Sequence, residues 1–567
     1  MEAKEFNLQD EPWIWCTLNG ESKELNLKDI FKMSQNIGEI TDVSPMVAIS
    51  IYRFLLAIMY SAFREERRWP GKHEIWSIDD WKNIHADPGG AIEQILAYLE
   101  TVHERMWLFH PEYPFYQKPD LKLKESKDPE DGKMPIGKMR MYAANSSQGT
   151  LFDHTVESDS SSTKSVYPDE AARLLLAFQN FDIGTAGTAE YHDDGQETKY
   201  LKDSLLRGEA VNFWQGNSLF QTLLLNLVPL HELDVLSKFE YPAENLSDRP
   251  SFEVDPDYLW KEPGCRQKTE KGDFVYIKKV EGIIDYLTWQ SRKTKLFRNE
   301  QNIIVSFART KGLVFPGNEN ILDPFVIYNY RVGKKPGEGG WKSKIRLDPE
   351  KQIWRSLDVL LARIIPSKHD FLPALTTKFL SETYSKEISN GDVKISLFSH
   401  YQEANQRIKD WSQQTFPIPA TYMKNESFVD GIEIILNMGK EISWGLKRSS
   451  QTIVEELLAG KEKSVQIDLE ADFWPLLQIP FAKFVNDLGQ YDEDAFWDDA
   501  SQIKIREIFS NWQNTVISMA RDVFNRATTK IRFNASGINA IIKGQQVLER
   551  SIAKLKNKYE IDNGGEQ

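Results

Sequence analysis

The chain contains 567 residues, 41% of them hydrophobic and 12% aromatic, which excludes a disordered protein and leaves room for two or three domains with a large core. Two cysteines, Cys16 and Cys265, exclude a disulfide scaffold and a four-cysteine zinc site and favour a reduced, cytoplasmic protein. The net charge of −14 argues against nonspecific nucleic-acid binding by the whole surface but is compatible with a local basic patch.

The N-terminal region predicts a short strand, a short helix and then a strongly apolar helix over 44–64. Ser44 and Pro45 supply a cap and a first-turn proline, and Arg53 lies near the middle of the apolar stretch. A charged residue in that position favours a helix buried in the protein core over a membrane span. The N-terminus also lacks the basic and apolar regions of a secretory signal peptide.

Two further helices are predicted before the next loop. Residues 77–80 form a capping-box pattern that places Trp81 in the first turn of a helix, and apolar residues fall on one helical face over 91–108. The segments 118–140 and 158–165 are rich in charged residues, proline and glycine, or in serine. We therefore predict that both are mobile loops, which flank an aromatic-bearing segment.

A predicted helix beginning at Pro168 runs directly into a segment with two glycines, Gly184 and Gly187. Phosphate-binding glycine loops follow a strand and open a helix, whereas this loop follows a helix and precedes no Gly-Lys-Ser/Thr sequence. A helix C-terminal stop accounts for Gly184 and leaves Gly187 unexplained. Either the segment is a tight turn, or its backbone approaches another molecule closely enough to require small residues.

A local reversal of charge lies between Trp289 and Lys311, within a region (276–345) that reads as strand-rich. This stretch holds six basic residues, one acidic residue and three interleaved aromatic residues. Cationic side chains with aromatic neighbours suit a phosphate backbone and exposed bases. The alternative is a solvated strand face with ordinary core aromatics, and the stretch alone does not decide between them. The basic residues are Arg292, Lys293, Lys295, Arg298, Arg309 and Lys311.

From about residue 425 the pattern changes to four long amphipathic helices with short connections. Such a series favours an antiparallel bundle. We therefore predict an α+β protein with a large mixed domain over 1–420, followed by an antiparallel four-helix bundle over 421–567.

Candidate catalytic groups are few. The segment 190–194 contains one glutamate, one histidine and two aspartates, a set that suits a divalent metal or a solvated turn. Asp153 and His154 form an acid/base pair without a visible nucleophile. No Walker motif, nucleophile elbow or zinc finger is present. The sequence thus provides no positive evidence for an enzyme or a cofactor. Two alternative functions stay open: a stand-alone metal-dependent hydrolase or nuclease that uses 190–194, and a purely structural scaffold.

Six stretches, taken in order, carry a family resemblance. They are "FNLQDEPWI" (6–14), "FHPEYPFYQ" (109–117), "GTLFDH" (149–154), "EAARLLLAFQNFDIG" (170–184), "SLFQTLLLNLVP" (218–229) and "DYLTWQSRKTKLF" (285–297). Together they resemble CasA, the large subunit of the type I-E CRISPR surveillance complex called Cascade. Beyond residue 330 the likeness is mainly architectural, since that family also has a mixed N-terminal domain and a C-terminal four-helix bundle.

The resemblance implies a non-catalytic subunit of a crRNA-guided complex, without cofactor or membrane contact. Such a subunit lies beside the 5′ handle of the guide, together with other Cascade subunits. It inspects double-stranded DNA for the protospacer-adjacent motif, chiefly from the minor groove, where the guanine amino group distinguishes G·C from A·T. It also helps to open the duplex, holds the displaced strand and recruits the helicase–nuclease.

The resemblance also implies roles for particular residues. The family's glycine loop falls on 182–188, best on Gly184 and Gly187, and its minor-groove lysine falls near Arg309, with Lys311 close by. Its guide-handle loop falls on 145–154, and its strand-separating wedge on a polar segment after a strand (399–411). The residues so implied are Gly184, Thr185, Ala186, Gly187, Thr188, Arg309 and Lys311 for motif recognition, Asn145, Thr150, Leu151 and Phe152 for the guide handle, and Asn405 and Gln406 for the wedge.

Overall fold

The computed structural model divides the chain into two compact units. The first unit comprises 1–351, 364–383 and 393–416, and the second comprises 352–363, 384–392 and 417–567. The second unit thus combines the C-terminal region with short segments from the middle of the chain. The structure describes residues 4–64, 77–123, 132–140, 165–184, 186–191, 197–231, 248–255, 259–260, 266–268, 274–278, 280–314, 323–331, 340–344, 351–361, 371–383, 393–402, 408–419, 422, 426–459, 467–491 and 498–559.

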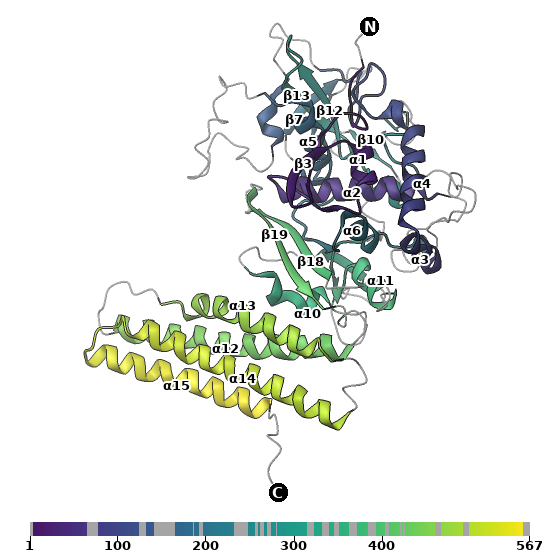
Figure 1. The fold of residues 1–567 in the computed structure, drawn as a ribbon. Coiled ribbons are helices and arrows are strands. Elements are labelled where there is room, and N and C mark those ends of the chain that lie inside the picture. Colours follow the sequence, from purple (N-terminus) through teal and green to yellow (C-terminus); the bar gives the residue numbers. More distant parts are fainter. Residues whose placement is uncertain are drawn as a thin grey trace. The chain divides into compact units, whose positions relative to one another are not determined.

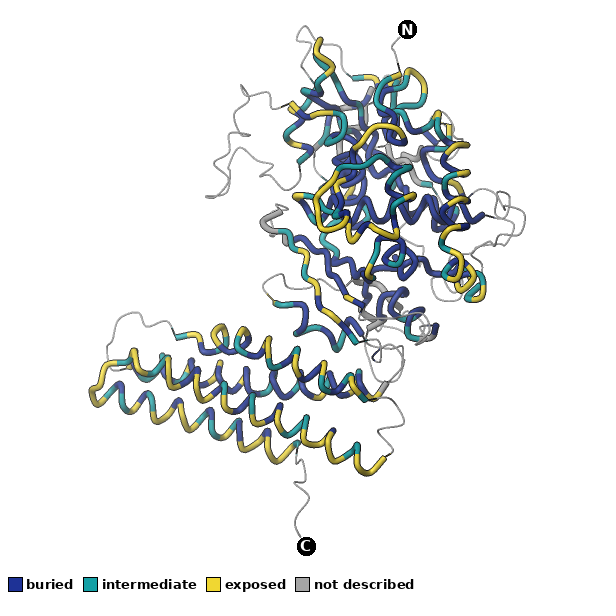
Figure 2. Tube along the Cα trace, in the orientation of Figure 1, coloured by how far each residue is buried: buried dark blue, intermediate teal, exposed yellow. Residues whose placement is uncertain are grey.

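A long buried helix, α2 (Pro45–Ala62), lies in the core of the first unit (Figures 1 and 2). Ser44 is its N-cap residue and Pro45 occupies its first turn, as predicted. Among the described residues α2 is the one helix long and apolar enough to cross a membrane, and 94% of it is buried inside the fold. Arg53 is fully buried and donates from Nη1 to Asp323 Oδ2 at 2.8 Å. The prediction of a core helix is therefore confirmed.

Other helices of the first unit pack against α2 or against one another. The predicted capping box is present, because the side chains and backbone groups of Ser77 and Asp80 bond reciprocally, and Trp81 is buried. The helix predicted over 91–108 ends earlier, at Thr101, because residues 107–109 pair instead as a strand with the N-terminus. These helices are α1 (Leu27–Lys32), α3 (Ile78–Ala86), α4 (Pro88–Thr101), α5 (Pro168–Phe181), α6 (Leu219–Leu225), α9 (Ile283–Leu287), α11 (Leu375–Thr383), η2 (His103–Arg105) and η3 (Ile136–Met139).

The described strands form small sheets of two or three strands. One of them contains the antiparallel pair β12–β13, in which Arg292 lies opposite Lys311 and Thr294 opposite Arg309, with β6 on the other edge of β13. The strands are β1 (Glu5–Asn7), β2 (Ile14–Leu18), β3 (Glu21–Leu25), β4 (Ile37–Ile40), β5 (Trp107–Phe109), β6 (Met134–Pro135), β7 (Ala186–Tyr191), β8 (Glu197–Tyr200), β9 (Val211–Gln215), β10 (Arg266–Lys268), β11 (Phe274–Ile277), β12 (Arg292–Arg298), β13 (Ile304–Lys311), β14 (Leu313–Val314), β15 (Tyr328–Arg331), β16 (Gly340–Lys344), β17 (Phe371–Leu372), β18 (Val393–Gln402) and β19 (Ile408–Ile418).

Four long helices form most of the second unit (Figure 1): α12 (Glu426–Ala459), α13 (Leu469–Leu488), α14 (Asp499–Thr528) and α15 (Ala535–Lys558). Each turns an apolar stripe inward, and α12 contacts all three others. The Trp512 indole donates to the Ile435 carbonyl at 3.0 Å. The short segment of η4 (Ile353–Ser356) and α10 (Leu357–Leu360) packs on the same helices through Trp354. The predicted mixed fold with C-terminal helices is confirmed.

Candidate nucleic-acid interface

Two of the predicted site segments lie side by side in the first unit. α5 ends at Phe181, β7 begins at Ala186, and β7 packs against β13, the strand that carries Arg309 and Lys311. An ideal Cβ atom at Gly187 would lie 2.9 Å from the carbonyl oxygen of Arg309, so the two backbones are in close contact there. The predicted glycine loop and the predicted minor-groove residue, about 120 positions apart in the sequence, are thus neighbours in the fold.

A single carboxylate joins these two segments. Asp182 is the C-cap residue of α5 and is buried. Its Oδ1 accepts from Arg309 Nη1 at 2.6 Å, and its Oδ2 accepts from Arg292 Nε at 2.5 Å. Burial lowers the pKa of the Arg292 guanidinium, and the adjacent Asp182 carboxylate opposes that shift. Asp182 thus links the two arginines at the root of the glycine loop, and Asp203, which pairs with Arg207, is a second carboxylate near Arg292.

Close contacts within the protein explain why both positions of the loop are glycine. The Gly184 N–H donates to Asp203 Oδ1 at 2.8 Å, and a Cβ atom at Gly184 would lie 2.8 Å from the Asp203 backbone nitrogen. At Gly187 a Cβ atom would meet both the Arg309 carbonyl and the Leu201 side chain at 2.9 Å. A glycine at 187 could not be explained from the sequence because neither neighbour is close to it in the chain, whereas these contacts explain it.

The remaining loop residues differ in what the structure describes. Thr188 is buried on β7. Ala186 begins β7, but its side chain and all of Thr185 lie outside the described residues. The backbone from Ala186 onward is therefore a strand paired with β8 and not an extended irregular loop.

The basic stretch of β12 and β13 is largely paired within the protein. Lys293 Nζ donates to the Glu190 carboxylate at 2.8 Å, and Lys295 Nζ donates to the Pro119 carbonyl at 2.6 Å. Arg298 pairs with Glu5 and stacks on the Phe109 ring. Lys311 is 3% exposed and Arg309 has a side-chain exposure of 14%. Of the predicted cations, Arg309 therefore combines partial exposure with a position beside the glycine loop.

The aromatic residues of the same stretch have different environments. Trp289 and Phe307 are buried in the core. Their burial agrees with the alternative interpretation of this stretch, in which the aromatic residues are ordinary core residues. Phe297 instead lies under the ammonium group of Lys133, 4.7 Å from the ring centroid. Sequence reasoning missed Asp182, Glu190 and Glu5 as partners of these cations because each comes from a distant segment and no local spacing links them.

The acidic segment of the alternative function is only partly described. Glu190 is buried, and besides Lys293 its carboxylate has Lys118 Nζ at 3.7 Å. Its negative charge is thus neutralised by lysines. The histidine and aspartates at 192–194 lie outside the described residues, and within the described part no group of three or more His, Cys, Asp or Glu side chains is arranged to hold a metal.

The other predicted site residues also lie outside the part of the chain that the structure describes. Asn145, Thr150, Leu151 and Phe152 belong to 141–164, between η3 and α5. Asn405 and Gln406 belong to 403–407, which connects β18 to β19, two strands that are neighbours in one sheet.

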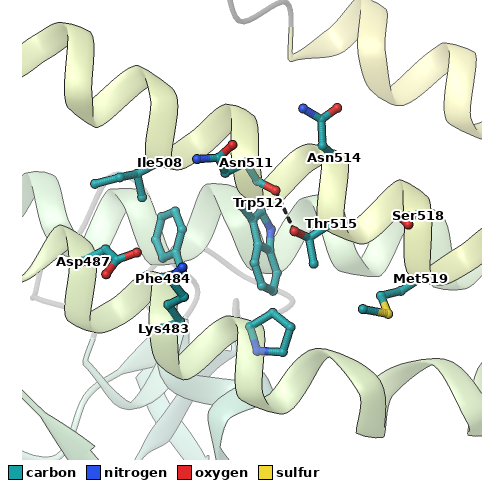
Figure 3. Close-up of a pocket in the computed structure, with 11 residues that line it drawn as sticks. Lys483, Phe484, Asp487, Ile508, Asn511, Trp512, Asn514, Thr515, Ser518 and Met519 are labelled. Atoms are coloured by element: carbon teal, nitrogen blue, oxygen red, sulfur yellow. Dashed lines mark hydrogen bonds between the residues drawn. The ribbon is translucent and has the colours of Figure 1, made fainter.

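A pocket of about 510 Å³ lies in the second unit, between α13 and α14 (Figure 3). Phe484 and Trp512 supply apolar walls, and Lys483 and Asp487 lie on one side. The Thr515 hydroxyl donates to the Asn511 carbonyl of the same helix at 2.7 Å. The pocket contains none of the residues that the sequence predicted for a site.

Comparison with known proteins agrees with this architecture. The family model for CRISPR-associated protein Cse1 matches residues 7–523. The CRISPR-associated protein CasA/Cse1 of Thermus thermophilus is 25% identical over 568 residues, which cover 97% of this chain and 98% of that protein.

Solved structures share the fold over nearly the whole chain, as two examples show. The crystal structure of Cse1 from Acidimicrobium ferrooxidans matches with a TM-score of 0.75 and 20% identity, over 98% of this chain and 99% of that one. A chain of a CRISPR RNA-guided surveillance complex matches with a TM-score of 0.68 and 16% identity, over 97% of this chain and 99% of that one. Because the Cse1 family model spans residues 7–523, this chain belongs to the CRISPR-associated protein Cse1 family, also called CasA.

Proposed function

We propose that this chain is the large subunit of a type I-E, crRNA-guided DNA-surveillance complex. In that role it recognises the protospacer-adjacent motif in double-stranded DNA, assists duplex opening and R-loop formation, and recruits the helicase–nuclease. Membership of the Cse1 family supports the role, as does the shared fold with a chain of a CRISPR RNA-guided surveillance complex. The observation that carries motif recognition is the contact between the glycine loop and the strand bearing Arg309.

The proposed contact uses the backbone around 184–188 and one cation. A segment with little side-chain bulk can lie against the minor groove and reject a sequence sterically. Arg309 is held beside it by Asp182 at 2.6 Å. Since Asp182 also binds the buried Arg292, Arg309 can turn toward a phosphate or a base edge while Asp182 keeps a partner. Asp182 is therefore a positioning residue that sets Arg309 and the glycine loop relative to each other.

Other parts of the role are assigned to further segments. Residues 145–154, with Phe152, would contact the 5′ handle of the guide, and Asn405 and Gln406 would act as the wedge. An inserted side chain costs about a few kcal/mol for each base step that it unstacks, a cost that later RNA–DNA pairing offsets. We also propose that α12–α15 form an antiparallel four-helix bundle within the complex, beside other subunits.

The proposed role is non-catalytic, and the alternative function is enzymatic. If the chain is instead a stand-alone metal-dependent hydrolase or nuclease, the segment 190–194 must bind a metal although lysines hold Glu190. Gel shifts with the assembled complex, with and without this chain, separate the two. A motif preference that requires this chain supports the proposal, whereas metal-dependent turnover by the isolated chain supports the rival.

Replacing Arg309 with alanine is expected to weaken binding of motif-bearing duplexes by the assembled complex. Because one phosphate or groove contact is lost, the log–log salt dependence should flatten by about one unit. Lys311→Ala should have a smaller effect on the slope, since Lys311 is 3% exposed.

The matched control is Arg298→Ala. Arg298 lies on the partner strand β12 and pairs with Glu5, away from the glycine loop. Filter binding or gel shifts at several salt concentrations provide the measurement. An Arg309→Ala complex with unchanged affinity and slope would remove Arg309 from the interface.

Replacing Asn405 and Gln406 together with alanine should slow R-loop formation on duplex targets and spare binding to single-stranded targets. A wedge acts only where base pairs must be opened, so a single-stranded target bypasses it. Stopped-flow fluorescence of a base analogue next to the motif measures the opening rate. Equal slowing on both kinds of target would assign these residues another role.

A further inference from the structure

A short segment of the first unit, 203–208, is bonded to the root of the glycine loop. The Ser204 N–H donates to the Asp182 carbonyl at 3.0 Å. The Asp203 carboxylate accepts from the Gly184 N–H at 2.8 Å. One end of this segment is thus fixed to the residues that follow α5.

The other end of the segment is bonded to a histidine on β18. The Gly208 N–H donates to His400 Nε2 at 2.8 Å. Because this nitrogen accepts a hydrogen bond, it carries no proton, and the imidazole is neutral with its hydrogen on Nδ1. His400 is buried, and its ring stands edge-on to that of Phe181, the last residue of α5, with the centroids 5.4 Å apart. His400 therefore contacts both the segment 203–208 and the end of α5.

His400 lies where the hairpin of β18 and β19 extends beyond its neighbouring strand. The ladder between β9 and β18 ends at the pair Val211–Phe398, and His400 follows two residues later. The two strands, which are neighbours in one sheet, then lead to their connection at 403–407. Two strands alone are marginally stable, so a buried attachment at this point determines where the distal part of the hairpin is held.

We infer that His400 is a positioning residue that, through the segment 203–208, holds the β18–β19 hairpin at a fixed distance from the glycine loop. This assignment rests on the proposed function, in which the glycine loop and Arg309 read the motif and the connection at 403–407 opens the next base pairs. Successive base pairs are about 3.4 Å apart along the duplex. A displacement of the hairpin by that distance would direct it to the wrong base step, and the His400–Gly208 bond prevents such a displacement.

The test compares two substitutions of His400 in the assembled complex. His400→Phe keeps a ring beside Phe181 and removes the acceptor for the Gly208 N–H, whereas His400→Gln supplies a neutral carbonyl oxygen as acceptor. Stopped-flow fluorescence of a base analogue next to the motif is recorded on two duplexes, one fully paired and one mismatched over the first base pairs after the motif. His400→Phe should open the fully paired duplex roughly tenfold more slowly, as expected when one buried hydrogen bond is lost from the opening step. It should bind the mismatched duplex at the wild-type rate, and His400→Gln should restore opening of the paired duplex.

Ser412→Ala is the matched control. Ser412 lies on β19 of the same hairpin and shares a hydrogen bond of 3.0 Å with the Ser399 hydroxyl. Its removal leaves the His400–Gly208 bond intact, so the opening rate should match that of the wild-type complex. A merely structural role of His400 would instead lower the fraction of active complex, and that loss affects the paired and the mismatched duplex equally.

Two results overturn the assignment and leave motif recognition standing: wild-type opening of the paired duplex by His400→Phe, or equal slowing on both duplexes. A wild-type complex without any motif preference refutes the proposed function instead, and this assignment with it. If His400→Phe does not join the complex, Asp203→Ala tests the other end of the segment, since the Asp203 side chain is 46% exposed and its loss releases Gly184. That variant should also slow opening of the paired duplex selectively, and a wild-type rate overturns the assignment.

Discussion

Replacing Asp323 with alanine is expected to lower the free energy of unfolding of the first unit by about 3–5 kcal/mol. Asp323 and Arg53 are both fully buried, and Asp323 also accepts from the Tyr286 hydroxyl at 3.1 Å and from the Phe325 N–H at 2.9 Å. The substitution leaves the Arg53 guanidinium without its carboxylate in the middle of the apolar helix α2. The cost therefore comes from an uncompensated buried charge.

Chemical denaturation followed by circular dichroism measures this loss. The control is Lys543→Ala in the second unit, because Lys543 and Glu456 form an exposed pair with exposures of 47% and 26%. Such a pair contributes about 1 kcal/mol or less. A loss of that small size in Asp323→Ala would contradict the buried pair.

The second large effect is expected from Asp182→Asn, on motif recognition. Asparagine keeps the size of the side chain and removes the charge that holds Arg309 at 2.6 Å and Arg292 at 2.5 Å. The assembled complex should lose tenfold or more in affinity for motif-bearing duplexes, about 1.4 kcal/mol or more. Binding to single-stranded targets should persist, because pairing with the guide does not involve this cluster.

A purely structural role of Asp182 predicts a different pattern. It would lower thermal stability and reduce binding to both kinds of target. A double-mutant cycle with Arg309→Ala decides the matter, since residues that act as a unit show an interaction energy of about 0.5–3 kcal/mol. Additive effects of the two substitutions on duplex affinity would separate Asp182 from Arg309 in function.

Local sequence signals predicted the elements that depend on local physics. The cap and first-turn proline at 44–45 and the capping box at 77–80 were enough to place α2 and α3. The end of α4 at Thr101 was missed, because pairing of β5 with β1 joins residues about 100 positions apart. Apolar periodicity alone does not contain that contact.

The candidate site was predictable in its parts but not in its internal bonding. Family resemblance pointed to 184–188 and to Arg309, and the fold brings these segments together. The pairing of the β12–β13 cations with acids was not foreseen, and the stretch is less available to DNA than its composition implied. The internal contacts of Gly187 also make it a poor site for a test by substitution. A valine there would press on the Arg309 carbonyl and on Leu201, so a loss of DNA binding would not isolate groove contact.

The most direct test of motif recognition compares duplex binding by the complex assembled with the wild-type chain, with Arg309→Ala, or without the chain. The duplexes are identical except for the adjacent motif, and a single-stranded target of the same sequence is the reference. The wild-type complex should prefer the motif-bearing duplex. Arg309→Ala should reduce this preference, and the complex without the chain should lack it. All complexes that contain the chain should bind the single-stranded target alike. An undiminished preference in the complex that lacks this chain would contradict motif recognition by this subunit.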